Sequence, residues 1–507
     1  MLAKGFQITC IALLLSCKPV LAQPNVDLSD VGQVALENTG AANAQQPFLH
    51  GLAQLHNFEY GDAADDFKEA RSIDPDFALA YWGEAMTHNH PIWMQQDREK
   101  ALAILNTYAP TPAARQEKTA SELARDLLAA ADILYGEGKK HDRDDRYMAF
   151  MAALHDKYPK NVEVAAQYAL SIMGTAHEGR DFMLYMQAAA LMQQFIVLYP
   201  GHPGVAHYLI HATDDPIHVP LGLKAAQAYA DIAPNAAHAQ HMTTHIFLAL
   251  GDWDGVIRAN IRALDIMNER RAANEQAAAG CGHYASWLMY GYLQQSNRDK
   301  AHEIMLRCQQ NIARGEMKGT GPAYHYGWQR AMYLFDTKEW DGDIALNNAD
   351  VGDDYRARFD LLVMDGFVAL AQGDTEAARA LYNTAEAPLD SIFSFWDKQG
   401  FAADHEPRMK PAVQRMQLNA QILFEEGKAD QAIAVMREAV ALESGMSFGF
   451  GPPSPPKPSH EMLGEMLIEM GRLEEAREIL QTALRRTPNK RLTVDALEHL
   501  SDKIAEN

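Results

Sequence analysis

Small residues and a proline recur along this chain at fixed intervals, and this spacing constrains the fold more than any other feature. A glycine is followed after 12 residues by an alanine, after 19 by a second alanine and after 24 by a proline. The pattern occurs near both ends, as Gly51, Ala63, Ala70 and Pro75 and as Gly464, Ala476, Ala483 and Pro488. Small side chains let helices approach closely, and proline ends a helix because it has no amide hydrogen to donate. The spacing therefore predicts packed helical pairs, repeated along the chain.

Two more stretches follow the same register, although without the proline. Their small residues are Gly366, Gly373, Ala378 and Ala385, and then Ala420, Gly427, Ala432 and Ala439. Weaker units begin near residues 78, 169, 203, 237 and 282, while 111–160 and 320–350 are expected to form longer or degenerate pairs. The chain should therefore contain about eleven helical hairpins.

These units resemble the tetratricopeptide repeat, whose period is about 34 residues. The resemblance covers most of residues 47–490. It implies an all-α fold, a tetratricopeptide-type α–α solenoid in which the hairpins stack into a right-handed superhelix. It also implies a concave groove, lined by the first helix of each unit, that binds a protein, a peptide or a small molecule.

The N-terminus has the pattern of a secretory signal peptide over residues 1–22. Lys4 is followed by the apolar run ITCIALLLSC and by small residues that end at Ala22. The letters LLSC also resemble a lipoprotein signal that would anchor the chain at Cys17, but Leu15 is untypical of it, so ordinary cleavage is favoured. The protein is therefore expected to be periplasmic or secreted.

The remaining chain divides into four predicted regions. Residues 23–46 form a leader that is poorly ordered or a short helix, 47–160 hold N-terminal repeats, 161–312 central histidine-rich repeats, and 313–505 C-terminal repeats with a proline-rich insertion at 447–458. No later apolar stretch is long enough to cross a membrane. The formal charge of -22 and the lack of a basic block argue against nucleic acid as a partner.

Histidines recur at the same 34-residue interval in the central repeats. His177, His211 and His245 are spaced in this way, and so are His207 and His241. In the tetratricopeptide register these residues, together with His238 and Asp214, occupy positions that face the groove. Helix geometry also places His207, His211 and Asp214 on one face, and His238, His241 and His245 on one face.

This pattern predicts a transition-metal site, because imidazoles four residues apart on a helix can bind one ion and neighbouring helices can supply more ligands. The predicted ligands are His177, His207, His211, Asp214, His238, His241 and His245. Histidines with a carboxylate suit copper, iron or zinc. The alternative is a hydrogen-bonded ladder of histidines that holds the helices in register.

Other histidines are weaker candidates. His88 and His90, one repeat after His56, are possible additional groove ligands. His218, His283 and His325 are also candidates for the groove or its rim, but each taken alone is expected to be structural.

Two cysteines, Cys281 and Cys308, remain after the predicted cleavage. They fall at the same end of one predicted hairpin, so they form either a disulfide, as an oxidising compartment allows, or two buried core residues.

Two classes of function fit these features. The first is an exported scaffold that binds a partner or ligand in its groove and carries a metal site in the central repeats. The second is a metal-dependent extracytoplasmic enzyme that uses the same site. The motifs HYLIHATDDP and HAQHMTTHIF resemble those of secreted bacterial histidine-rich repeat proteins without an established activity, and the chain lacks the common catalytic signatures.

Overall fold

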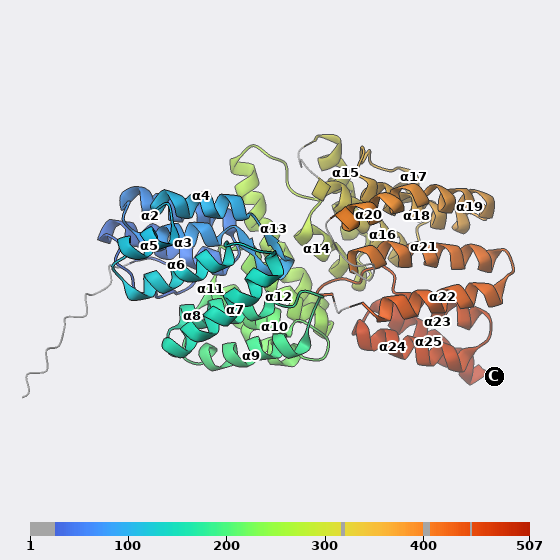
Figure 1. Ribbon diagram of the computed structural model, residues 1–507. Coiled ribbons are helices and arrows are strands. Elements are labelled where there is room, and N and C mark those ends of the chain that lie inside the picture. The colour runs from blue at the N-terminus through green and yellow to red at the C-terminus, as the bar shows by residue number, and fades with distance from the viewer. Residues whose placement is uncertain (1–25, 316–319, 399–405, 447–448, 507) are drawn as a thin grey trace, which may run out of the picture.

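The computed structural model describes residues 26–315, 320–398, 406–446 and 449–506. Within these ranges the chain is all-α, with 25 α-helices, three short 3-10 helices and one pair of two-residue strands. Successive helices pack as hairpins, and the hairpins stack side by side along the chain (Figure 1). This confirms the predicted fold class. The predicted signal peptide, including Cys17, lies outside the described residues.

The first region precedes the histidine-rich repeats. Its elements are η1 Ala42–Ala44, α1 Gln45–His56, α2 Tyr60–Ile73, α3 Ala78–Met86, β1 Asn89–His90, η2 Pro91–Trp93, β2 Gln95–Gln96, α4 Arg98–Tyr108, α5 Pro112–Lys118, α6 Glu122–Leu134 and α7 Lys140–Lys157. The strands β1 and β2 pair antiparallel.

The central region carries half of the chain's 20 histidines. Its elements are α8 Val162–Met173, α9 Phe182–Ile196, α10 Pro203–Thr213, η3 Val219–Leu221, α11 Leu223–Ile232, α12 Ala237–Leu250, α13 Trp253–Ala273, α14 His283–Gln294 and α15 Arg298–Ala313.

The last region forms the C-terminal half of the solenoid. Its helices are α16 Thr320–Thr337, α17 Asp343–Leu346, α18 Tyr355–Ala371, α19 Thr375–Thr384, α20 Glu386–Lys398, α21 Glu406–Glu425, α22 Ala429–Ser444, α23 Ser459–Glu469, α24 Leu473–Arg486 and α25 Arg491–Glu506. No helix in the described ranges is long and apolar enough to cross a membrane.

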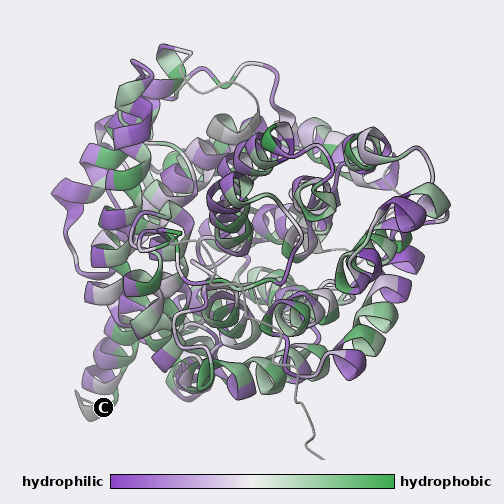
Figure 2. Ribbon diagram, turned by 90° about the vertical axis from the view of Figure 1, so that its left-hand side faces the viewer, coloured by the Kyte–Doolittle hydropathy of each residue, from purple (hydrophilic) through white to green (hydrophobic). Residues whose placement is uncertain are grey.

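The repeated small residues lie where helices meet. A Cβ atom on Gly51 of α1 would stand 2.9 Å from the Asp66 Cβ atom of α2, and one on Gly464 of α23 would stand 2.6 Å from Leu480 of α24. Alanines 63, 70, 476 and 483 are almost completely buried. Most helices carry both hydrophilic and hydrophobic residues (Figure 2), as amphipathic helices of a stacked solenoid do.

Residues 26–41, predicted as a poorly ordered leader or a short helix, instead follow a largely non-helical path along the central helices. Leu36 is fully buried, the amide of Gln33 donates to the carbonyl of Gly201, and the amide of Ala35 donates to Glu163. Hydrogen bonds to residues far along the chain therefore satisfy this backbone in place of a helix.

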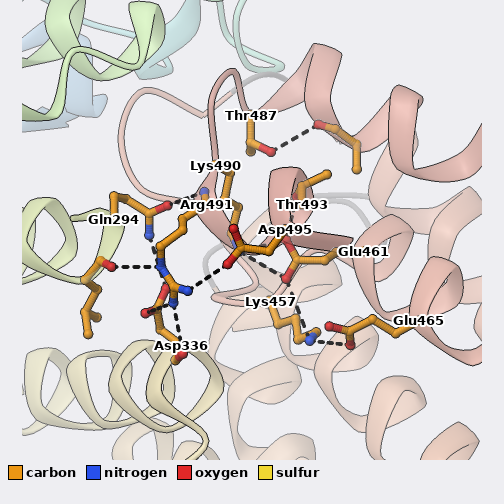
Figure 3. A network of polar contacts seen from close by, with 12 residues as sticks. Gln294, Asp336, Lys457, Glu461, Glu465, Thr487, Lys490, Arg491, Thr493 and Asp495 are labelled. Carbon is orange, nitrogen blue, oxygen red and sulfur yellow. Dashed lines mark hydrogen bonds and ion pairs between the residues drawn. The ribbon is translucent and has the colours of Figure 1, made fainter. Parts of the chain in front are cut away.

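The C-terminal hairpin returns to the middle of the chain (Figure 3). Arg491 at the start of α25 forms an ion pair with Asp336 of α16, and its amide donates to the side-chain oxygen of Gln294 in α14. Beside it, Lys490 pairs with the buried Glu461 of α23. Asn489 donates to the carbonyl of Leu250 at the end of α12. Except for the pair Lys490–Glu461, these contacts join residues more than 150 positions apart in sequence.

Candidate metal centre

Three helices bring six histidines into one continuous group. We call this group the histidine band, and it consists of His207 and His211 of α10, His238, His241 and His245 of α12, and His283 of α14. Ring centroids are 4.8 Å apart for His207 and His211, 5.1 Å for His207 and His238, and 4.5 Å for His241 and His283. The structure therefore brings together five of the six predicted histidine ligands and adds His283.

The band is covered rather than open to a groove. His207 and His241 are completely buried. On one side the ring of Phe58, which follows α1, lies 4.3 Å from the ring of His207. On the other side Phe450, from the proline-rich segment, stacks on His245 at 5.5 Å. Groove-facing positions of the repeat are thus enclosed here, because segments from both halves of the chain pack over them.

In three of the rings, a hydrogen bond from the Nδ1 atom fixes the orientation of the imidazole. The Nδ1 atom of His207 donates to the backbone carbonyl of His56 at 2.6 Å, and Nδ1 of His241 donates to Oδ1 of Asn260 at 2.8 Å. The Asn260 amide is oriented by its own donation to the carbonyl of Val256. In His245, Nδ1 donates to Asp214 Oδ2 at 2.8 Å. A neutral imidazole that donates from Nδ1 carries a bare lone pair on Nε2.

These bare nitrogens face one another. The Nε2 atoms of His241 and His245 are 3.3 Å apart, although in neutral rings neither has a proton to offer the other. The Nε2 atoms of His207, His211 and His238 are buried and have no hydrogen-bond partner among the described residues. Buried polar atoms are normally paired, so these nitrogens are candidates for holding a metal ion.

The geometry fits transition-metal ions. Two nitrogens bound at about 2.0–2.1 Å to one tetrahedral ion stand about 3.3–3.4 Å apart, which matches His241 and His245. The ligand nitrogens of His207, His211 and His238 lie within 4.8 Å of one another, and so do those of His241, His245 and His283. Metal-binding histidines usually donate their second nitrogen to a carbonyl or carboxylate, as His207, His241 and His245 do.

Burial keeps the rings neutral. It lowers the pKa of His207, His238 and His241 well below the usual value, and neighbouring imidazoles lower each of these pKa values further. His283 lies on the exposed side of the band, and there the surrounding protein atoms and the imidazoles of His245 and His325 lower its pKa to about 3. At neutral pH these lone pairs are therefore available to a metal ion.

Asp214, predicted as a ligand, lies with His211 and His245 in a further group that could hold a metal ion, and it also orients His245. It lies just after the end of α10, its Oδ2 atom accepts from His245, and Oδ1 accepts from Arg180 at 2.5 Å. Burial alone would raise the pKa of Asp214, but Arg180 and the two neighbouring histidines, His211 and His245, bring it below its usual value. Its oxygens are thus engaged by protein donors, and it remains a carboxylate.

His177 does not belong to the band. The prediction placed it on a helix that begins near residue 169, but α8 begins at Val162, where Asn161 caps the helix, and ends at Met173. His177 therefore lies in the following loop, with its Nε2 atom 2.8 Å from Asp145 and its ring stacked on His141.

His88 and His90 also lie apart from it. His90 interacts with the carbonyl of Thr87 and stacks on Tyr60. His88 precedes β1 and joins none of the metal-competent groups found among the described residues.

A second cluster shows the contrast with the band. His56 and His202 both contact the carboxylate of the buried Glu163, at 2.7 and 3.1 Å. The other nitrogen of His56 meets the Tyr208 hydroxyl, and that of His202 accepts from the amide of Val205. Every ring nitrogen here has a protein partner, so this cluster is a structural tie between α1, α8 and α10.

Sequence reasoning missed Arg180 and Asn260, and it named His283 only as a weaker candidate for the groove or its rim. His283 stands at the second position of its unit, as His238 does, but α13 is 21 residues long and moves it off the 34-residue interval. Arg180 and Asn260 act through other residues, and no spacing marks them.

Cys281 lies two residues before His283 and forms a disulfide with Cys308 of α15.

Comparisons with known proteins concern the fold. Residues 458–490, which contain α23 and α24, match the sequence model of the tetratricopeptide repeat. No curated protein matches the chain significantly in sequence.

Several solved structures align with most of the chain. Yeast Tom70 aligns at 10% identity over 92% of this chain and 96% of that chain, with a TM-score of 0.35. The human IFIT1 dimer with PPP-AAAA aligns at 12% over 92% and 91%, with a TM-score of 0.37. The APC/C hetero-tetramer Cut9-Hcn1 aligns at 12% over 93% and 79%, with a TM-score of 0.36. Such distant alignments carry no information on what this chain binds.

Proposed function

We propose that this tetratricopeptide-repeat protein binds transition-metal ions in its histidine band. The observation that carries the proposal is the pair His241 and His245, whose Nε2 atoms face each other at 3.3 Å while both Nδ1 atoms donate elsewhere. One group of three histidines, His207, His211 and His238, would hold one ion. A second group, His241, His245 and His283, would hold another.

The donor set favours copper or zinc. Imidazole nitrogens suit zinc, copper, iron and nickel, whereas non-haem iron sites usually add a carboxylate ligand, and the nearest one, Asp214, is engaged by Arg180 and His245. Bound there, such an ion supplies Lewis acidity, and copper also supplies redox chemistry. The chain's own contribution is to orient the rings and to bury those of α10 and α12 away from bulk water.

The test is metal analysis of the full chain purified without a histidine tag. We expect about one to two copper or zinc ions per chain by elemental mass spectrometry. The double substitution His241→Ala and His245→Ala should remove at least one of them. His302→Ala is the matched control, because His302 is a half-buried histidine of α15 that pairs with Asp343 and lies outside the band. A wild-type chain that neither contains nor takes up these metals would overturn the proposal.

A second candidate function is metal-dependent catalysis. It is favoured by one observation, namely that His283 belongs to the band and also lines a cavity of about 240 Å³. A catalytic metal site needs an open position for substrate or water, and this cavity offers access on the His283 side. If the site is not catalytic, the metal would stabilise a scaffold that binds a protein, peptide or small molecule.

We also propose that the protein is exported. The apolar segment before Ala22 and the disulfide between Cys281 and Cys308 support this, since disulfides persist mainly in oxidising compartments. N-terminal sequencing of protein recovered from a host periplasm or medium should give Gln23 as the first residue. Recovery of the intact chain from the cytosol alone would contradict export.

A further inference from the structure

The two groups of three histidines in the band differ in their exposure. We call His207, His211 and His238 the inner group, and their ligand nitrogens lie within 4.8 Å of one another. The exposed fractions of these three residues are 0%, 2% and 8%. In the other group, His283 is exposed and lines the cavity of about 240 Å³. The inner group is therefore a largely buried set of donors that consists of imidazoles alone.

Aromatic rings pack against the inner group. The ring of Phe58 lies 4.3 Å from that of His207 and 5.7 Å from each of the other two rings. Tyr229 stacks on His207 at 5.3 Å. A zinc ion held by three histidines keeps a water as its fourth ligand, and a buried water needs polar partners of its own. Ring carbons offer none, so this environment favours an ion whose coordination is complete with three nitrogens.

The carboxylates that contact histidines of the inner group are already neutralised. Asp214 and Glu59 make these contacts. Asp214 is paired with Arg180 at 2.5 Å, and Glu59 is paired with Arg270 at 3.1 Å. The electrostatic cost of burying an ion grows with the square of its charge, so a dication costs about four times as much as a monocation. The inner group therefore disfavours a doubly charged ion.

We propose that the inner group selects copper in the Cu(I) state over zinc and Cu(II). Cu(I) carries a single positive charge, and three neutral nitrogens complete its coordination, so it suits both the charge and the aromatic surroundings of this group. Copper binds in its reduced state, and no electron passes to or from the chain. This proposal rests on the proposed function, because it names the ion that one part of the histidine band takes.

Competition titrations on the full chain test this selection. Cu(I) is supplied without oxygen in the presence of ascorbate, which leaves protein disulfides intact, and bicinchoninate competes for it. A zinc-sensitive dye competes for zinc in parallel. The double substitution His241→Ala and His245→Ala isolates the inner group, which should still bind about one Cu(I), at least about 100-fold more tightly than zinc. Equal or tighter binding of zinc would overturn the proposal and leave the metal centre standing.

A second measurement uses the wild-type chain, so it does not depend on the folding of that variant. The chain loaded with one Cu(I) should show three nitrogen ligands in its X-ray absorption spectrum. After exposure to air it should stay without the electron paramagnetic resonance signal of Cu(II), because the surroundings of the site disfavour the second charge. A Cu(II) signal that accounts for the whole of the bound copper would overturn the proposal.

The substitution Arg180→Gln tests the role of charge. It leaves Asp214 without its cation, so the preference for Cu(I) over zinc should shrink about tenfold or more. Arg115→Gln is the matched control, because Arg115 is similarly buried and pairs with Asp132 outside the band. An unchanged preference in Arg180→Gln would overturn the selection by charge. A wild-type chain that binds neither Cu(I) nor zinc would overturn the proposed function itself, so the two failures can be told apart.

Discussion

At the residue scale, Asp214 joins α10 to α12, the two helices that carry most of the histidine band. It lies at the end of α10 and accepts from His245 of α12, while Arg180 neutralises it. Asp214→Asn keeps the size of the side chain but removes the charge that holds Nδ1 of His245. We expect metal affinity to fall about 10- to 100-fold, as for other groups that orient metal ligands. Competition titrations with a metal-sensitive dye measure this.

Asp215→Asn is the control for that change. Asp215 is equally buried and lies 3.5 Å from Arg180, but its main partner is His218, which is outside the band. If both variants lost metal affinity to the same extent, the effect would come from the unpaired Arg180 and the orienting role of Asp214 would be wrong.

The raised pKa of Asp360 in α18 should make the stability of the protein depend on pH. Burial raises its pKa to about 7, and Gln414 lies 3.3 Å away. The unfolded chain releases this proton near pH 4, so the native state holds more protons between pH 4 and 7, and stability falls as pH rises through that range. Asp360→Asn should therefore stabilise the protein more at pH 8 than at pH 5, by roughly 2 kcal/mol. Thermal unfolding at both pH values measures the difference, and a pH-independent effect would contradict it.

At the element scale, the disulfide fixes the start of α14. It joins Cys281 to Cys308 across 27 residues and lies two residues before His283. Replacing both cysteines by serine should destabilise the protein by about 3 kcal/mol, the expected loss for a loop of this length. Thermal unfolding with and without a reductant checks this. The reductant should lower the melting temperature of the wild type and leave the double variant unchanged.

Element lengths also explain how far sequence reasoning reached. Regular units such as α23 and α24 were predictable, because Gly464 and Ala476 must be small where those helices cross. The 34-residue interval also gave α10 and α12 correctly, since they begin at Pro203 and Ala237. It failed at α8, which begins earlier than expected and leaves His177 outside. The unit predicted near residue 282 does begin there, as α14 at His283, although the long α13 moves it off the 34-residue interval. The repeat period of a sequence predicts which residues pack between helices, but it does not predict where a helix or loop is longer than the repeat allows.

At the scale of the whole molecule, the histidine band is enclosed by parts of the chain that no repeat pattern relates to it. Phe58 comes from the first hairpin and Phe450 from the segment before α23. Such contacts depend on how far the solenoid curves, which follows from the sum of many small angles between units. The sequence could therefore predict which histidines share a face, but not that the face is covered.

The return of the C-terminal hairpin should govern access to the band. Arg491 binds Asp336, the carbonyl of Leu293 and, through its amide, Gln294, and thereby holds α25 against α14 and α16. In Arg491→Ala the 7% exposed Asp336 loses its partner, which destabilises this contact by about 3 kcal/mol. The segment that carries Phe450 leads directly into α23. The cover that Phe450 forms over His245 should therefore open more often in this variant.

Hydrogen exchange followed by mass spectrometry tests this expectation. Exchange should rise in residues 449–506 of the Arg491→Ala chain and stay unchanged in α2–α6, and the rate of metal release to a chelator should rise with it. Arg477→Ala, on the exposed side of α24, is the control and should change neither. Faster exchange without faster metal release would mean that metal leaves by another route, past Phe58 rather than past Phe450.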